Sequence, residues 1–109
     1  MNLAEQLING WCKFDGTAGT PSCDDHYNVA SITDNATGDY TVVWDTDFAS
    51  ANYAVSAIAA DGADNVNVHC ILAHTTPLAT TGTRIYCGST ASNSKADQEV
   101  VTIMAVGNQ

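Results

Sequence analysis

The feature that most constrains this chain is an alternation of apolar and polar side chains, which recurs in short runs from Trp11 to the C-terminus. Successive side chains of a β-strand point to opposite faces of a sheet, so each run predicts a strand. The runs cover residues 11–14, 27–32, 40–44, 53–60, 66–72, 83–87 and 99–106. Turn-forming Gly, Asn, Asp and Thr separate them. Six to seven or more such strands predict an all-β fold, an antiparallel β-sandwich.

The segment ITDNATGDYTVVW (32–44) has the pattern of a hairpin. Asp and Asn side chains hydrogen-bond their own backbone in turns, and Gly38 adopts a positive φ without strain. Turn formation therefore accounts for Asp34 and Asp39, and we expect no functional site at either residue. The strand that follows should bury Tyr40, Val42 and Trp44.

Residues 1–9 differ from the rest, because their apolar side chains have helical spacing. Asn2 is a suitable N-cap, Glu5 follows three residues later as in a capping box, and Gly10 ends the pattern. The apolar side of this predicted helix is formed by Leu3, Leu7 and Ile8. So short a helix is unstable alone in water, and we expect it to pack on its own copies in a homotrimer. The chain thus divides into a trimerisation or attachment segment, 1–9, and a β-sandwich domain, 10–109.

The charge balance excludes some partners. The formal net charge is −9, and the only cations are Lys13, Arg84 and Lys95. So few cations cannot neutralise a phosphate backbone or hold an anionic membrane surface. No apolar run approaches the ~18 residues of a membrane span, and the N-terminus lacks the basic and apolar regions of a secretory signal. We therefore expect no nucleic-acid partner and no membrane insertion.

Four cysteines are candidates for disulfide bonds: Cys12, Cys23, Cys70 and Cys87. They allow three pairings, and the sequence does not choose among them. Cys12–Cys23 with Cys70–Cys87 is the local pairing, and the turn residues between Cys12 and Cys23 suit a short cross-link. No CxxC occurs, and the spacings match no zinc-finger pattern. Disulfides, free buried thiols and a metal site remain open alternatives.

No residue pattern indicates a catalytic site. A G-x-S-x-G nucleophile elbow is absent, and Glu99 has no second carboxylate at a readable glycosidase separation. Asp24, Asp25 and His26 are adjacent in CDDHY (23–27), but neighbours on a strand point to opposite faces and cannot all reach one metal. A surface loop is favoured there. We expect no enzymatic activity and no cofactor.

Two other arrangements leave a metal as an alternative. The turn DGADNVN offers the oxygen ligands Asp61, Asp64 and Asn67. It lacks the ligand order of a calcium hand, so a hairpin turn is favoured. His69 and His74 flank CILA, and in a three-fold assembly one histidine per chain could meet its copies on the axis. A strand-end or loop histidine is favoured, and we assign no metal site.

Three stretches together resemble one known family. They are INGWCKFDGTAGT (8–20), YNVASITDNATGDYTVVWDTDFASANYAV (27–55) and DQEVVTIMAVG (97–107). With them, about residues 8–109 are similar to a β-sandwich domain at the C-terminal ends of tailed-phage and prophage tail-fibre proteins. The matching residues are Trp11, Phe14, Gly16, Tyr27, Asn28, Val29, Ser31, Ile32, Asp34, Asn35, Gly38, Tyr40, Thr41, Val42, Phe48, Ala51, Asn52, Tyr53 and Val55. The hairpin is the specific part. The cysteines depart from the family, which usually has small or apolar residues there.

The resemblance implies a trimeric knob at the virion surface, on a tail fibre or the capsid exterior, without enzymatic activity. Its implied partners are other virion proteins and a host receptor, either a surface glycan or an outer-membrane protein. Loop composition places receptor contact on residues 61–67, 74–82 and 88–95. The predicted contact residues are His74, Tyr86, Asp61 and Asp64. The alternative function is a capsid decoration or cement protein, seated at a symmetry axis through its N-terminal segment.

Overall fold

The computed structural model describes residues 7–63 and 65–109. Within these residues the chain is all-β, and no helix occurs. The strands are β1 (Gly10–Phe14), β2 (Cys23–Tyr27), β3 (Val29–Ala36), β4 (Asp39–Trp44), β5 (Ala54–Ala60), β6 (Val68–Leu72), β7 (Leu78–Ala79), β8 (Gly82–Ser89), β9 (Ser94–Lys95) and β10 (Val100–Val106). Each predicted run overlaps one of these strands by at least four residues, whereas β2, β7 and β9 were not predicted.

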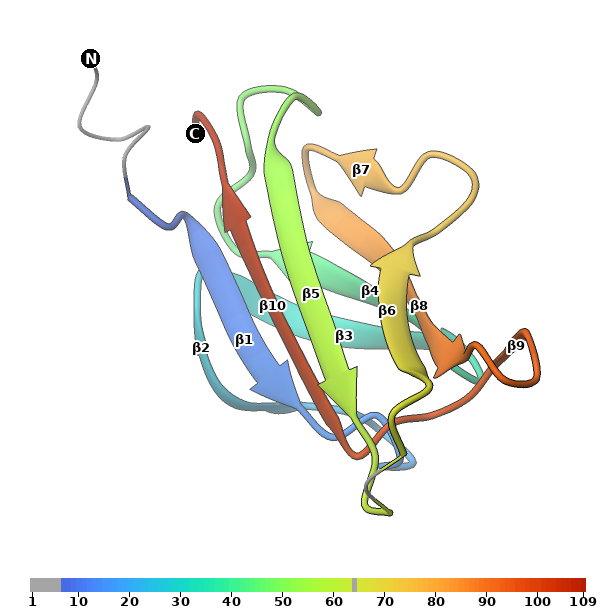
Figure 1. Cartoon of the computed structure of the whole chain (residues 1–109). Coiled ribbons are helices and arrows are strands. Elements are labelled where there is room, and N and C mark those ends of the chain that lie inside the picture. Colours follow the sequence, from blue (N-terminus) through green and yellow to red (C-terminus); the bar gives the residue numbers. More distant parts are fainter. Residues whose placement is uncertain (1–6, 64) are drawn as a thin grey trace.

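All strand pairs are antiparallel, and they form two sheets that lie face to face in Figure 1. The four-stranded sheet has the order β2-β1-β10-β5. The six-stranded sheet has the order β3-β4-β8-β6, and the short strands β7 and β9 pair with β8. Because β1 pairs with β10, the first and last described strands are neighbours. The Asn9 backbone N–H donates to the Ala105 carbonyl, and the Gly107 N–H donates to Asn9 Oδ1.

The core lies between the sheets and takes the inward side chains of both. As predicted, Tyr40, Val42 and Trp44 of β4 are buried. From the four-stranded sheet, Phe14 meets Tyr40 edge to face, with the ring centroids 5.2 Å apart. The other inward side chains of β1 and β10, including Val101, complete the part of the core that the four-stranded sheet contributes.

An aromatic cluster closes one end of the core. Phe48 and Tyr53 stack with their ring centroids 4.0 Å apart, and Trp44 meets both edge to face. Trp44 Nε1 donates a hydrogen bond to the Tyr53 hydroxyl at 3.2 Å. The same hydroxyl lies 2.7–2.9 Å from three oxygens of the β7–β8 hairpin: the carbonyls of Ala79 and Gly82, and Thr83 Oγ1. The residues before β5 are thereby fixed to the six-stranded sheet.

The predicted N-terminal helix falls mainly on residues 1–6, which lie outside the described residues and include Leu3. Residues 7–9 are described and are not helical. Leu7 and Ile8 are exposed, and Asn9 already bonds to β10. Sheet hydrogen bonding thus begins at Asn9, one residue before β1 and within the range predicted to be helical. In the described part of the chain, no helix is long and apolar enough to span a bilayer.

The segment CDDHY, predicted as a surface loop, is strand β2. It pairs with β1 at the edge of the four-stranded sheet, and all its side chains except that of Cys23 are exposed. An edge strand that buries almost none of its side chains does not need alternating apolar and polar residues. Its sequence therefore lacks the two-residue period by which strands are predicted.

Candidate functional site

The outward side of the four-stranded sheet carries an apolar surface in a chain that is otherwise acidic. Strand register aligns Trp11, Met104 and Ser56 in one row across β1, β10 and β5. The next row contains Lys13, Thr102 and Ile58. We call these six side chains, together with Ile8, the apolar face.

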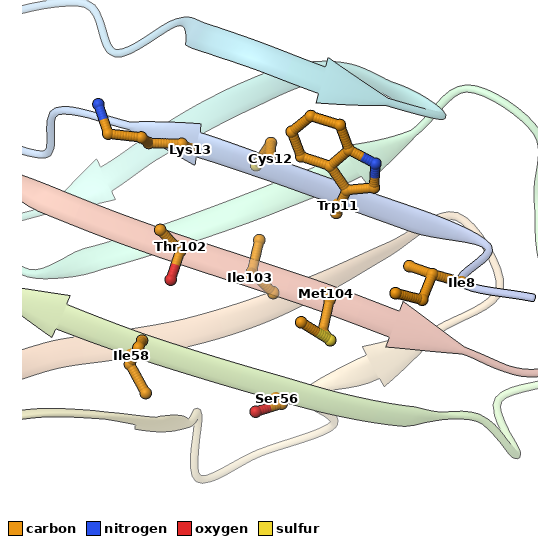
Figure 2. Close-up of a pocket in the computed structure, with 9 residues that line it drawn as sticks. All are labelled: Ile8, Trp11, Cys12, Lys13, Ser56, Ile58, Thr102, Ile103 and Met104. Carbon is orange, nitrogen blue, oxygen red and sulfur yellow. The ribbon is translucent and has the colours of Figure 1, made fainter.

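The apolar face is exposed to solvent. The exposed fractions are 70% for Ile58, 45% for Met104 and 37% for Trp11. An open hollow of about 420 Å³ lies over these strands. Figure 2 shows Ile8, Trp11, Met104 and Ile58 around it, with no acidic side chain among the residues that line it. On β2, beside Trp11, Tyr27 continues the exposed surface.

Charge is nearly absent from the apolar face. The strands β1, β10 and β5 contain one charged residue, Lys13, and no acid. Lys13 Nζ forms an ion pair with Asp24 Oδ2 at 2.8 Å, and this hydrogen bond raises the pKa of Lys13. The cation is therefore neutralised at the rim, and the centre of the face is left apolar.

The outward side of the six-stranded sheet is polar by comparison. Arg84 forms a two-pronged ion pair with Asp39, with Nε–Oδ1 and Nη2–Oδ2 distances of 2.9 and 2.7 Å. Asn35 Nδ2 also donates to Asp39 Oδ1. The hydrogen bonds from Arg84 lower the pKa of Asp39 although burial opposes this. Asp39, expected only to form a turn, is a buried member of this network.

The predicted receptor-contact residues do not form one cluster. The loop with Asp61 precedes β6 and the loop with His74 follows it, so the two lie at opposite ends of that strand. Asp61 Oδ1 accepts the backbone N–H groups of Ala63 and Asn65, as in a turn. Asp64 lies outside the described residues. The loops 61–67 and 88–95 do meet, because the Thr90 N–H donates to the Asn67 carbonyl.

Tyr86 belongs to β8 rather than to a loop, and it is partly buried. Lys95 Nζ lies 4.1 Å from its ring centroid, and the Arg84 guanidinium carbon lies 5.6 Å away. The ring thus has two cationic neighbours, an arrangement that stabilises the six-stranded sheet surface. His74 is exposed in the turn after β6.

The four cysteines are brought together in two pairs and are free thiols. Cys70 of β6 stands directly opposite Cys87 of β8, with their sulfur atoms 3.2 Å apart. Cys12 of β1 and Cys23 of β2 are neighbours across the other sheet. Within residues 7–63 and 65–109, no group of three or more His, Cys, Asp or Glu side chains is placed to hold a metal ion.

The apolar face was missed by the sequence interpretation. Its outward residues Met104 and Ile58 were recognised as strand residues, but the inward neighbours Ile103 and Ala57 are apolar as well. The sequence did contain one signal of this face: β5 and β10 have no charged residue at either their inward or their outward positions. Comparison of the whole chain with protein-family models, curated proteins and solved structures found no match.

Proposed function

We propose that this chain is a non-enzymatic structural protein of a tailed-phage virion, a homotrimeric, fibre-tip-like knob at the particle surface. The resemblance of residues 27–55, which include the hairpin, to tail-fibre domains supports the virion assignment. The observation that carries the proposal of self-assembly is the apolar face. Its occupant is a second copy of the chain, and three copies complete the assembly.

The size of the face supports an interface. Three strands ~4.8 Å apart that rise ~3.3 Å per residue give a face on the order of 300 Å² in projection. A patch of this size on a monomer is commonly functional. Exposed Tyr27, beside Trp11 on β2, extends it toward the roughly 800 Å² per partner that a stable interface buries.

Charge supports a copy of the same chain as the occupant. Two chains of net charge −9 repel each other wherever their acidic surfaces approach. The strands β1, β10 and β5 form a surface through which two copies can meet without bringing acids together. The buried centre of such an interface gains from Trp11 and Met104, residue types that are enriched in protein interfaces.

The free edge of β5 is a second supporting observation. β5 pairs with β10 on one side, and on the other side it lies beside β6 of the six-stranded sheet without forming a ladder with it. Its sequence AVSAIAA contains neither charge nor proline. Soluble proteins usually protect exposed edges with such residues or cover them. Burial of this edge between subunits would provide the missing protection.

The test is the oligomeric state of a face variant. We expect Ile58→Lys to shift the protein from trimer to monomer in analytical ultracentrifugation, because the interface would bury an unpaired cation. Ile71→Lys is the matched control, since Ile71 is 52% exposed on β6 of the other sheet. The control should remain trimeric. A monomeric wild-type protein at tens of micromolar, or an unaffected Ile58→Lys variant, would exclude this assembly.

Receptor contact is tested separately for the two ends of the molecule. His74→Ala and Asp61→Ala should be introduced singly into the phage that encodes the chain, and adsorption to host cells measured. We expect loss of adsorption from the end that faces the host and none from the other. Unchanged adsorption in both variants would leave the knob without its proposed receptor role.

A capsid decoration protein is the second candidate, favoured by the exposed apolar side chains of Leu7 and Ile8 at the start of the described chain. In that case, Leu7→Ser should release the protein from purified particles while the trimer persists in solution. Release of the trimer with unchanged adsorption would favour this function over the fibre tip.

A further inference from the structure

Both cysteine pairs connect an edge strand to the inner strand beside it. β6 is the edge of the six-stranded sheet and contributes Cys70, opposite Cys87 on β8. β2 is the edge of the four-stranded sheet and contributes Cys23, near Cys12 on β1. In each pair the edge cysteine is partly exposed and the inner cysteine is buried. The same arrangement of a partly exposed edge thiol beside a buried inner thiol thus occurs on both sheets.

The Cys70–Cys87 pair has the geometry that a disulfide needs. Residues directly opposite in an antiparallel ladder have Cα atoms about 4.5 or 5.5 Å apart. Both values fall within the ~4.4–6.8 Å range of disulfide-bonded cysteines. The Cys87 thiol donates a hydrogen bond to Cys70 Sγ at 3.2 Å, so the two side chains already point at each other. No backbone movement is required to join them.

The Cys12–Cys23 pair is diagonal across its ladder. Cys23 is registered with Phe14, two residues from Cys12, at an irregularity between Lys13 and Phe14. Cys12 and Phe14 both point inward, and Cys23 packs against the same core. The two side chains thus lie on the same inner side of the sheet, and burial, followed by the charge and hydrogen bond of Cys23, raises the pKa of Cys12.

We infer that Cys70–Cys87 and Cys12–Cys23 are sites of disulfide formation, and that a small disulfide oxidant converts the four-thiol chain into a form with two cross-links. The proposal does not depend on the virion assignment. It selects one of the three pairings that the sequence leaves open.

At the first site, the reaction has an order. Cys70 lines a hollow of about 260 Å³ between β5 and β6, whereas Cys87 does not line it and is 0% exposed. The hydrogen bond from Cys87 lowers the pKa of Cys70, and the thiolate is the attacking species. Cys70 therefore attacks the oxidant first, and Cys87 resolves the intermediate.

With oxidised glutathione as oxidant, the Cys70 thiolate bonds to one glutathione sulfur, and the glutathione S–S bond breaks to release a glutathione thiolate. Cys87 then loses its proton and attacks Cys70 Sγ, which breaks the mixed disulfide and releases the second glutathione thiolate. The two released thiolates take up the protons of the two cysteines. Two protein thiols are oxidised, and one glutathione disulfide is reduced to two thiols.

The second site should react more slowly. Cys23 lines another open hollow, beside His26 and Ile32. Burial raises the pKa of Cys23, the hydrogen bond of Cys12 opposes this, and the negative charge of Asp24 adds to the increase. Less thiolate is therefore present at Cys23 than at Cys70, and the carboxylate of Asp24 also repels an anionic oxidant.

The experiment treats the folded, reduced full chain with oxidised glutathione and maps the products by peptide mass spectrometry without reduction. We expect cross-linked peptides 70–87 and 12–23, with 70–87 appearing first. Other pairs, cross-links between chains, or four thiols that remain unmodified would overturn the assignment.

Two variants test the order of attack. Cys87→Ala should accumulate a mixed disulfide between Cys70 and glutathione, because the resolving thiol is absent. Cys70→Ala is the matched control and should leave Cys87 unmodified in the folded protein. Modification of Cys87 in that variant would reverse the proposed order. If either variant fails to fold, the wild-type time course still decides the pairing.

Discussion

The Tyr53 hydroxyl provides the sharpest test of how the aromatic cluster holds the two sheets together. Tyr53→Phe removes one oxygen and keeps the ring that stacks on Phe48. Trp44 Nε1 loses the acceptor at 3.2 Å, and the oxygens of the β7–β8 hairpin lose their shared donor. Both rings are buried, with exposed fractions of 3% for Trp44 and 7% for Tyr53. Water therefore cannot replace the lost partner easily.

The expected loss follows from these contacts. A buried donor left without an acceptor costs about 1–3 kcal/mol, and one further hydrogen bond contributes about 0.5–1.5 kcal/mol. We expect the free energy of unfolding to fall by roughly 2–4 kcal/mol, out of about 5–15 kcal/mol for a typical domain. Tyr27→Phe is the control, since the exposed Tyr27 side chain should change stability by less than about 0.5 kcal/mol.

The assay is urea unfolding followed by far-UV circular dichroism at one fixed protein concentration. With a denaturant slope of about 2 kcal/mol/M, in the middle of the usual range, Tyr53→Phe should lower the midpoint by roughly 1–2 M at unchanged slope. Trp44→Phe removes the Nε1 donor. In a chain that already carries Trp44→Phe, Tyr53→Phe should therefore lower the free energy of unfolding by less than it does in the wild type. A Tyr53→Phe effect as small as that of Tyr27→Phe, or strict additivity of the two changes, would refute the reasoning.

Two further predictions concern the turn and the ion pair next to it. Arg84 lowers the pKa of Asp39 in the folded protein. The ion pair therefore stabilises the fold fully at pH values above about 3.9, the pKa of the carboxyl in the unfolded chain. This contribution is lost as the pH falls through the lower pKa of the folded state. Asp39→Asn should therefore be less stable at neutral pH and lose less stability between about pH 4 and pH 2; an equal acid dependence would argue against this role. Gly38 has φ of 63°, and a Cβ there would overlap the Cys87 carbonyl. Gly38→Ala should cost at least about 2 kcal/mol, whereas at Gly19, where a Cβ meets nothing within 4 Å, the same change should be nearly neutral in urea unfolding.

Much of the sandwich-like layering could be predicted from local pattern, because inward and outward residues alternate cleanly in strands such as β4. Tyr40, Val42 and Trp44 are apolar and buried as expected. The edge strand β2 could not be found in this way, since only Cys23 among its side chains packs on the core. The N-terminal segment illustrates a different limit. Asn9 follows the sheet because of its bonds to Ala105 and Gly107, partners that are distant in sequence.

The candidate surface was harder to predict than the fold. Period-two alternation identifies which residues share a face of a strand, but it cannot say which face is covered when both are apolar. In β10, Ile103 is buried and Met104 is exposed, although both are large apolar residues. The cysteine pairing likewise depended on register: Cys70 lies opposite Cys87 only because β6 and β8 are neighbours in the six-stranded sheet.

The pairing of β1 with β10 gives the molecule a polarity. Residues 9 and 107 are joined by a hydrogen bond, so both described ends of the chain leave the sheets at the same pole (Figure 1). The ladder Ala54↔Val106 to Ala60↔Val100 carries β5 from this pole to the opposite one, where the loop 61–67 begins. A tether at either terminus would hold this pole against its support and direct the loops 61–67 and 88–95 away from it. His74 would then lie on the sheltered side, and Asp61 on the side that meets the surroundings first.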